Sequence, residues 1–180
     1  MQMNDAEPVQ AHRPSTGLLI AGAMCLLPFL LPYHQRPIAS FQAEWLAASL
    51  GVAATLAALV DAASHRDSPG AAVPQAGLWL LAFAALVALQ AAIIVPSYFS
   101  VPSLGIAYVV FAALLLWLGA QLAVSIGAER TAAVLAGFVL AGALANAAAA
   151  MIQFYGRPVW LEDLVAGLGR DRAYGNIAHA

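Results

Sequence analysis

Residues with the chemistry to bind a phosphate occur together in one polar segment near the start of the chain. His34, Arg36 and Glu44 fall within this segment, and Arg157 follows a much later apolar stretch. Arginine holds a phosphate through two parallel N–H···O bonds, and a histidine adds a further donor. Glu44, at the predicted start of a helix, can orient such an arginine or accept hydrogen bonds from the first turn. The pattern predicts a phosphate-binding site. The alternative is that Arg36 and Glu44 only anchor helix ends at lipid headgroups.

Three amides lie inside apolar stretches, at Gln90, Asn146 and Gln153. An unpaired amide in hydrocarbon is costly, so each is expected to face protein or a wet cavity. For Asn146 a hydrogen bond between helices is the favoured interpretation. Gln90 and Gln153 fall at the depth of the phosphate-binding segment, and both are candidates for the same substrate site.

The sequence does not identify catalytic residues, a metal site or a cofactor. His12 and His65 are predicted to lie on the opposite side of a membrane from His34, so these histidines cannot share a metal ion. The motifs of a nucleophile elbow and of a phosphate-binding glycine loop are also missing from the sequence. Sequence motifs alone therefore leave the catalytic residues unknown.

The elements that must position these residues are membrane-spanning helices. The chain has 180 residues, of which 63% are hydrophobic and 9% charged, and its mean hydropathy is +0.83. This composition excludes an ordinary soluble domain and intrinsic disorder, and a net charge of −2 gives no basic surface for nucleic acid. Five stretches without Asp, Glu, Lys or Arg predict an all-α, polytopic membrane protein with about five transmembrane helices. They are Gly17–Tyr33, Trp45–Val60, Ala76–Val95, Leu104–Ile126 and Ala132–Tyr155.

The organisation expected along the chain has three parts. Residues 1–16 form a cytoplasmic segment, residues 17–155 form the transmembrane region, and residues 156–180 form an extracytoplasmic tail with a short interfacial helix around Trp160. Arg13, Arg66 and Arg130 fall on one side, and among the short loops only Arg36 falls on the other, which favours a cytoplasmic N-terminus. The tail adds Arg157, Arg170 and Arg172 to the outer side and weakens this bias. The first apolar stretch is interpreted as a retained helix rather than a signal peptide, because it ends without small residues at a cleavage site.

Small residues recur every fourth position in the fifth stretch, and we expect this ridge to pack against a neighbouring helix. The alternative is that the ridge lines a substrate path. Its members are Ala133, Gly137, Ala141, Ala145 and Ala149.

Three segments of the sequence resemble one family. The first is an H-x-x-P pattern followed by an aromatic residue and E-W-L-A, formed by His34, Pro37, Phe41, Glu44, Trp45, Leu46 and Ala47. The second is Gln153-Phe154-Tyr155-Gly156. The third is an R-x-x-G-N segment containing Arg172, Gly175 and Asn176. In order and spacing these segments resemble the N-terminal portion of bacterial O-linked protein glycosylation ligases. These are pilin-type O-oligosaccharyltransferases of the O-antigen ligase and polymerase superfamily.

The resemblance implies a reaction, partners and a location. Members of this family move an oligosaccharide en bloc from undecaprenyl diphosphate to a Ser or Thr of an exported protein such as pilin. The partners implied are the lipid-linked oligosaccharide, the acceptor protein and lipids of the bacterial inner membrane, with no cofactor. His34, Arg36 and Arg157 would bind the diphosphate, and Glu44, Gln90 and Gln153 would complete the substrate site.

The resemblance also bears on catalysis by this chain. Family members are longer, and their essential catalytic residues follow in a large extracytoplasmic loop. We therefore expect the chain to be a truncated ligase that does not catalyse transfer by itself. The other functions considered are a non-catalytic subunit that binds lipid-linked glycan, and a small transporter. A transporter would favour charged or broken helices in mid-membrane.

Overall fold

The chain folds into helices joined by short connections. The computed structural model describes residues 15–31, 41–64, 71–94, 100–156, 158–161 and 165, and every regular element within these ranges is helical. The elements are α1 (Thr16–Leu26), η1 (Leu27–Leu30), α2 (Phe41–Ser64), α3 (Gln75–Ile94), α4 (Ser100–Ile126), α5 (Ala128–Tyr155) and η3 (Val159–Leu161). The predicted all-α class is confirmed.

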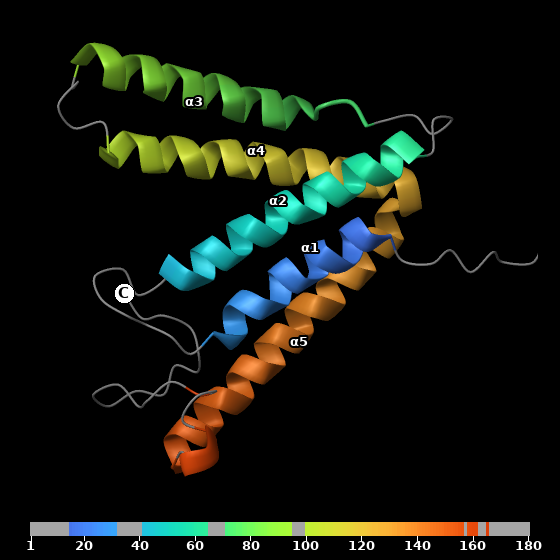
Figure 1. Cartoon of the computed structure of the whole chain (residues 1–180), viewed down its shortest axis with the longest axis vertical. Helices are drawn as coiled ribbons and strands as arrows, with labels where there is room; N and C mark the ends of the chain where they lie inside the picture. Colours follow the sequence, from blue (N-terminus) through green and yellow to red (C-terminus); the bar gives the residue numbers. More distant parts are fainter. Residues whose placement is uncertain are drawn as a thin grey trace, which may run out of the picture.

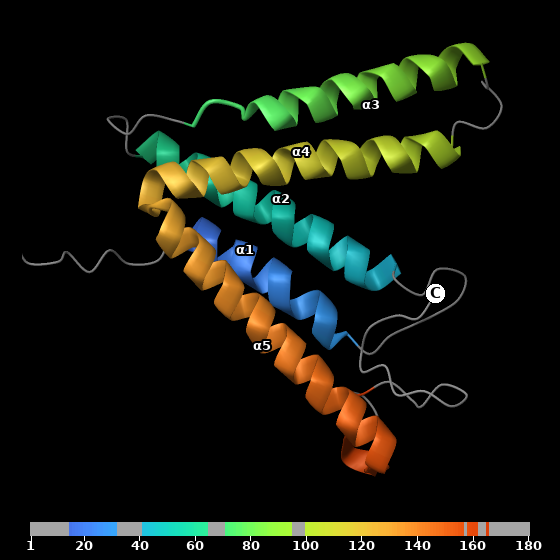
Figure 2. The ribbon, with the colours of Figure 1, turned by 180° about the vertical axis from the view of Figure 1, so that it is seen from behind.

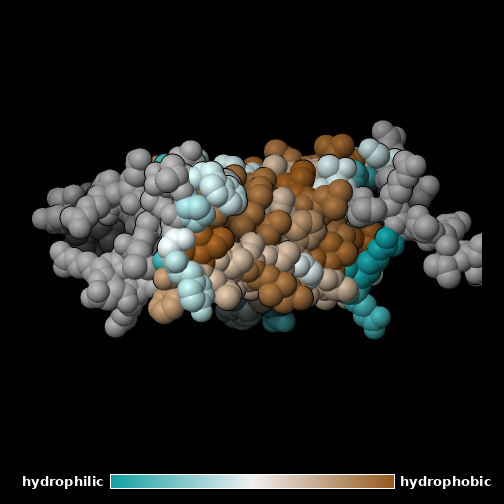
Figure 3. Space-filling model, turned by 90° about the horizontal axis from the view of Figure 1, so that it is seen from below, coloured by the Kyte–Doolittle hydropathy of each residue, from teal (hydrophilic) through white to brown (hydrophobic). Residues whose placement is uncertain are grey.

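Four of the helices, α2 to α5, are long and apolar enough to cross a membrane. The first apolar helix is shorter and covers Thr16–Leu30, about 24 Å if its α and 3-10 parts are added, against about 30 Å of hydrocarbon. Pro28 explains the change at Leu26, because proline has no N–H to continue the α-helical ladder. A band of apolar side chains crosses the middle of the surface, as expected of a protein surrounded by lipid (Figure 3).

Local chemistry sets where the helices begin and turn. At the start of α1, the Ser15 hydroxyl accepts a hydrogen bond from the N–H of Leu18 at 3.2 Å. Gly127 alone joins α4 to α5, and its φ of 91° is accessible to glycine at little cost. The carbonyl of Gly127 accepts a hydrogen bond from the Thr131 hydroxyl at 2.9 Å, which fixes the first turn of α5.

Because successive helices alternate in direction, the bundle has two distinct ends. We call them the Ser64 end, where α2 finishes, and the Phe41 end, where α2 begins. Helix α1 lies between α2 and α5, while α3 packs against α4 (Figures 1 and 2). Helices α4 and α5 meet at Gly127, at the Ser64 end, and diverge toward the Phe41 end (Figure 1).

Small residues allow the helices to approach closely near the Ser64 end. The buried core contains residues of α1, α2 and α4: Leu18, Ala21, Ala54, Ala58, Leu118 and Leu122. A Cβ added at Gly17 would lie 3.3 Å from the backbone of α2, so α1 and α2 are almost in backbone contact there. At two other glycines a phenylalanine ring fills the space that a side chain would occupy: Phe138 packs on Gly22, and Phe111 packs on Gly51.

Helix α5 uses only the C-terminal part of the predicted ridge of small residues for packing. Ala133, Gly137 and Ala141 are exposed, whereas Ala145 is half-buried and Ala149 is buried. The buried positions of α5 in the described chain are Thr131, Gly142, Ala149 and Gln153. Phe138 also faces α1, since its ring packs on Gly22. The physical reason is that the contact between Phe138 and Gly22, and that between Gly142 and Phe29, fix the rotation of α5 on α1 and η1.

Candidate functional site

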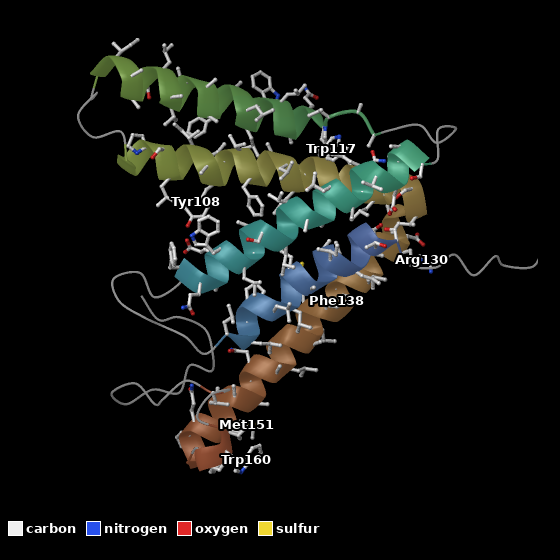
Figure 4. The ribbon with its side chains drawn as sticks, in the orientation of Figure 1. Tyr108, Trp117, Arg130, Phe138, Met151 and Trp160 are labelled. Atoms are coloured by element: carbon white, nitrogen blue, oxygen red, sulfur yellow. The ribbon has the colours of Figure 1, made fainter. Side chains whose placement is uncertain are left out.

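A carboxylate and a phenol meet at the Phe41 end of the bundle. Glu44 is exposed in the first turn of α2, and Tyr108 reaches it from α4 (Figure 4). The Tyr108 hydroxyl donates a hydrogen bond to Oε2 of Glu44. This bond joins residues 64 positions apart and holds the side chain of Glu44 against α4. One of the residues predicted for the substrate site is therefore fixed in place by tertiary structure.

Aromatic rings flank this carboxylate on α2. Phe41 and Trp45 form an edge-to-face pair with ring centroids 6.2 Å apart. Phe41 precedes Glu44 by three residues and Trp45 by four, so its side chain lies between theirs on the helix surface. The two rings are 52% and 61% exposed, which leaves them accessible to lipid or to a ligand. Glu44 and Trp45 of the E-W-L-A pattern, together with the aromatic residue Phe41 before it, thus form one surface at the start of α2.

The predicted amides have different environments. Gln153 is only 4% exposed, in the last turn of α5, and has an interaction partner, in agreement with the expectation that it faces protein. Asn146 is half-buried and also has a partner. Gln90 is exposed on α3, the helix that packs against α4. Membership of Gln90 in the same site as Glu44 stays a prediction.

Several predicted residues fall outside the described part of the chain, so their positions stay predictions. They are His34, Arg36, Pro37, Arg157, Arg172, Gly175 and Asn176. The predicted interfacial helix is described only in part. Its first residues form the 3-10 turn η3, with Trp160 77% exposed, and Val165 is buried.

Sequence reasoning missed a polar clamp at the Ser64 end. Gln121 of α4 is 5% exposed, and its Oε1 accepts a hydrogen bond from the N–H of Ala71 at 2.8 Å. One turn earlier on α4, Nε1 of Trp117 donates to the carbonyl of Ala71 at 3.3 Å (Figure 4). Both backbone groups of Ala71 are thereby satisfied where the chain enters α3. The available signal was a tryptophan and a glutamine four residues apart in an apolar helix, which share one face.

Tyr108 was missed for a different reason. In the sequence it is one aromatic residue in the fourth apolar stretch, and tyrosine is common where a span approaches the membrane surface. Its partner lies on another helix, so spacing along the chain cannot indicate the pair. Together, these three hydrogen bonds show that α4 positions polar groups at both ends of the bundle.

No protein-family model matches the chain, and no curated protein or solved structure gives a significant match. Any functional interpretation therefore depends on the residues and on their arrangement.

Proposed function

We propose that this protein binds undecaprenyl-diphosphate-linked oligosaccharide at its Phe41 end, as the membrane region of a pilin-type O-oligosaccharyltransferase. The observation that carries the proposal is the arrangement of Phe41, Glu44 and Trp45. These motif residues form one accessible surface, and Glu44 is held by Tyr108 from a distant part of the chain. An anchor at the headgroups would gain little from such a fixed geometry, whereas a binding site needs it.

The orientation of the bundle supports the same proposal. Arg66 follows α2 in the sequence and Arg130 lies in the first turn of α5, so both flank membrane spans at the Ser64 end, and positive residues that flank spans favour the cytoplasmic side. Figure 4 shows Arg130 at that end. The Phe41 end is then extracytoplasmic, in the inner membrane of a bacterium. The glycan of a lipid-linked donor and an exported acceptor such as pilin meet on that side.

The chemistry of transfer assigns distinct tasks to the predicted residues. The diphosphate leaving group carries negative charge, and cationic donors stabilise such charge as it develops. His34, Arg36 and Arg157 supply that cationic set under the proposal. A transporter is less well supported, since α3 contains no charged residue and α5 has its charged residues only in its first turn.

The test is to measure donor binding by the purified chain in lipid nanodiscs. Native mass spectrometry counts bound lipids and separates glycan-bearing from glycan-free forms by mass. We expect saturable binding of the lipid-linked oligosaccharide, weakened about tenfold or more by Arg36→Ala, since hydrogen bonds to charged groups are strong. His34→Ala should act in the same direction. Arg130→Ala is the matched control, because it removes an arginine from the opposite end.

A transfer assay tests whether this chain catalyses glycan transfer by itself. The chain is expressed in a strain that lacks its own ligase but makes donor and pilin. We expect no glycan-dependent increase in pilin mass from this chain alone. Such an increase would show that this chain is itself an active ligase. Failure of the nanodisc experiment to detect any donor binding would refute the proposed function itself.

A further inference from the structure

The contacts between helices divide the bundle into two units. Within the described chain, α3 makes its main contacts with α4, whereas α1 packs extensively against both α2 and α5 (Figures 1 and 2). The polar clamp at Ala71 also joins the segment before α3 to α4. We call the two units the α3–α4 hairpin and the α1–α2–α5 unit. The boundary between them has α4 on one side and α2 and α5 on the other.

The contacts across this boundary change in kind along α4. Near the Ser64 end, Leu118 and Leu122 are buried against α1 and α2. Farther along α4, the ring of Phe111 packs on Gly51 of α2. At the Phe41 end, where α4 has diverged from α5, the hydrogen bond from Tyr108 to Glu44 joins the two units (Figure 1). The boundary is therefore closed by apolar packing at one end and by a polar bond at the other.

The link between α4 and α5 has the properties of a hinge. The N–H of Gly127 donates to the carbonyl of Ala123 at 3.1 Å, and the carbonyl of Gly127 accepts from the N–H of Thr131 at 3.0 Å. Each helix is thus hydrogen-bonded up to Gly127, and the two backbone dihedrals of this residue set the angle between the helices. Among the described residues nothing lies within 4 Å of its Cβ position, which leaves room for these dihedrals to change.

A small rotation at this hinge is enough to break the bond at the far end. Tyr108 precedes Gly127 by 19 positions, or about 28 Å along a straight helix. A rotation of about 5° at Gly127 would move Tyr108 by about 2.4 Å, which takes its hydroxyl beyond hydrogen-bonding distance of Glu44. The bond therefore resists rotation at a point where its lever arm is long.

We propose that the α3–α4 hairpin rotates about Gly127 relative to the α1–α2–α5 unit, and that the hydrogen bond from Tyr108 to Glu44 holds the closed conformation. Rotation separates α4 from α2 at the Phe41 end and exposes the face of α2 around Gly51 to lipid chains. Glu44 has a further interaction, and the proposal needs only the bond that Tyr108 makes to it. The motion is also independent of the ligand that binds at this end, so its test is separate from that of the proposed function.

The rotation is measured as a distance between two spin labels by double electron–electron resonance in lipid nanodiscs. The labels are attached to introduced cysteines in a Cys25→Ala background, because Cys25 is the only cysteine of the sequence. The reporting pair, Gln42→Cys with Leu104→Cys, uses exposed positions of α2 and α4 and crosses the boundary at the Phe41 end.

Control pairs at exposed positions separate rotation from general loosening. One pair lies within the hairpin, one lies within the α1–α2–α5 unit, and one crosses the boundary near the Ser64 end. They are Ile93→Cys with Leu104→Cys, Gln42→Cys with Met151→Cys, and Val60→Cys with Val124→Cys.

Tyr108→Phe removes the donor hydroxyl and keeps the ring. We expect the fraction of molecules with a longer distance at the reporting pair to rise about tenfold, because a hydrogen bond to a carboxylate is lost. The control pairs should be unchanged. Tyr155→Phe alters another exposed tyrosine, at the end of α5, and should change none of the distances.

Gly51→Ala tests the same motion at a second contact. A Cβ at Gly51 would lie 2.6 Å from Cζ of Phe111, whereas ordinary contact begins at 3.4 Å, so the methyl group pushes the ring or α4 away from α2. We expect a longer distance at the reporting pair, and the longest in Gly51→Ala/Tyr108→Phe. Gly119→Ala adds a methyl group to α4 where no described atom lies within 4 Å, and it should have no effect.

Two results would overturn the inference. An unchanged distance at the reporting pair in both Tyr108→Phe and the double variant would show that the bond does not hold the two units together. An equal change at the two pairs that lie within one unit would show a general loosening of the fold in place of rotation about Gly127.

Discussion

The contact between α1 and α5 depends on the absence of a single methyl group at Gly22. Gly22 is buried, and the ring of Phe138 occupies the space beside it. A Cβ at this position would lie 2.3 Å from Cδ2, 2.4 Å from Cε2 and 2.8 Å from Cγ of Phe138. Ordinary contact begins at 3.4 Å, so Gly22→Ala requires a shift of about 1.1 Å between the two helices or of the ring.

The expected cost follows from two opposing effects. Overpacking of this kind costs about 1–3 kcal/mol, whereas alanine in place of glycine favours a helix by about 1 kcal/mol. Cγ lies next to the backbone of α5, so rotation of the ring cannot relieve the clash completely. The two effects combine to a cost of about 0–2 kcal/mol, and because the clash with Cγ remains we expect Gly22→Ala to lower the free energy of unfolding by about 1–2 kcal/mol. Gly137→Ala is the control, since nothing lies within 4 Å of its Cβ position, and it should be neutral or stabilising.

The assay is reversible unfolding of the purified protein in mixed micelles, followed by far-UV circular dichroism. A second substitution, Phe138→Leu, shortens the side chain that meets the new methyl group. The loss in free energy of unfolding of the double variant Gly22→Ala/Phe138→Leu should therefore be smaller than the sum of the losses in the two single variants, with a coupling of about 0.5–3 kcal/mol. Equal stability of Gly22→Ala and Gly137→Ala, with no coupling to position 138, would refute the packing argument.

Two further predictions concern the clamp and the orientation. Gln121→Leu removes the buried acceptor for the backbone N–H of Ala71, four residues before α3, and should cost about 1–3 kcal/mol in the same assay. Gln75→Leu, at the exposed start of α3, should cost little, and equal effects would contradict the clamp. Alkaline phosphatase fused after Arg36 or Ser100 should be active, because these positions are expected outside the cytoplasm. The same enzyme fused after Asp67 should be inactive, because the connection between α2 and α3 is expected in the cytoplasm. The reverse pattern would place the Phe41 end inside the cell.

Composition predicts the class of this fold better than it predicts the ends of the helices. The second charge-free stretch was expected to span Trp45–Val60, but α2 covers Phe41–Ser64. Glu44 and Asp61 lie within the helix, because a charged side chain near the end of a span can reach the headgroups or a partner. A criterion based on charge therefore shortens such a helix at both ends. It also overlooks Pro28, which ends the α-helical part of the first stretch although it carries no charge.

Spacing could not predict which face of α5 packs against its neighbours. The helix is rich in alanine and glycine on every side, so a ridge at intervals of four is no unique feature. The positions of two phenylalanines decide which face packs: Phe138 of α5 packs on Gly22 of α1, and Phe29 of η1 packs on Gly142 of α5. The face of α5 that carries Gly137 is left exposed. Size complementarity between distant residues is a tertiary property.

The asymmetry between the two ends of the bundle has a physical origin in side-chain size. At the Ser64 end, Ala58 and Leu122 pack with Leu18, and the single-residue link at Gly127 keeps α4 and α5 together. Toward the Phe41 end the helices diverge, and a polar bond between Glu44 and Tyr108 joins α2 to α4. A hydrogen bond to a charged group needs no apolar burial, so it can hold two helices where tight packing has ended. Under the proposed function, the same bond fixes a carboxylate at the end of the bundle where the lipid-linked donor binds.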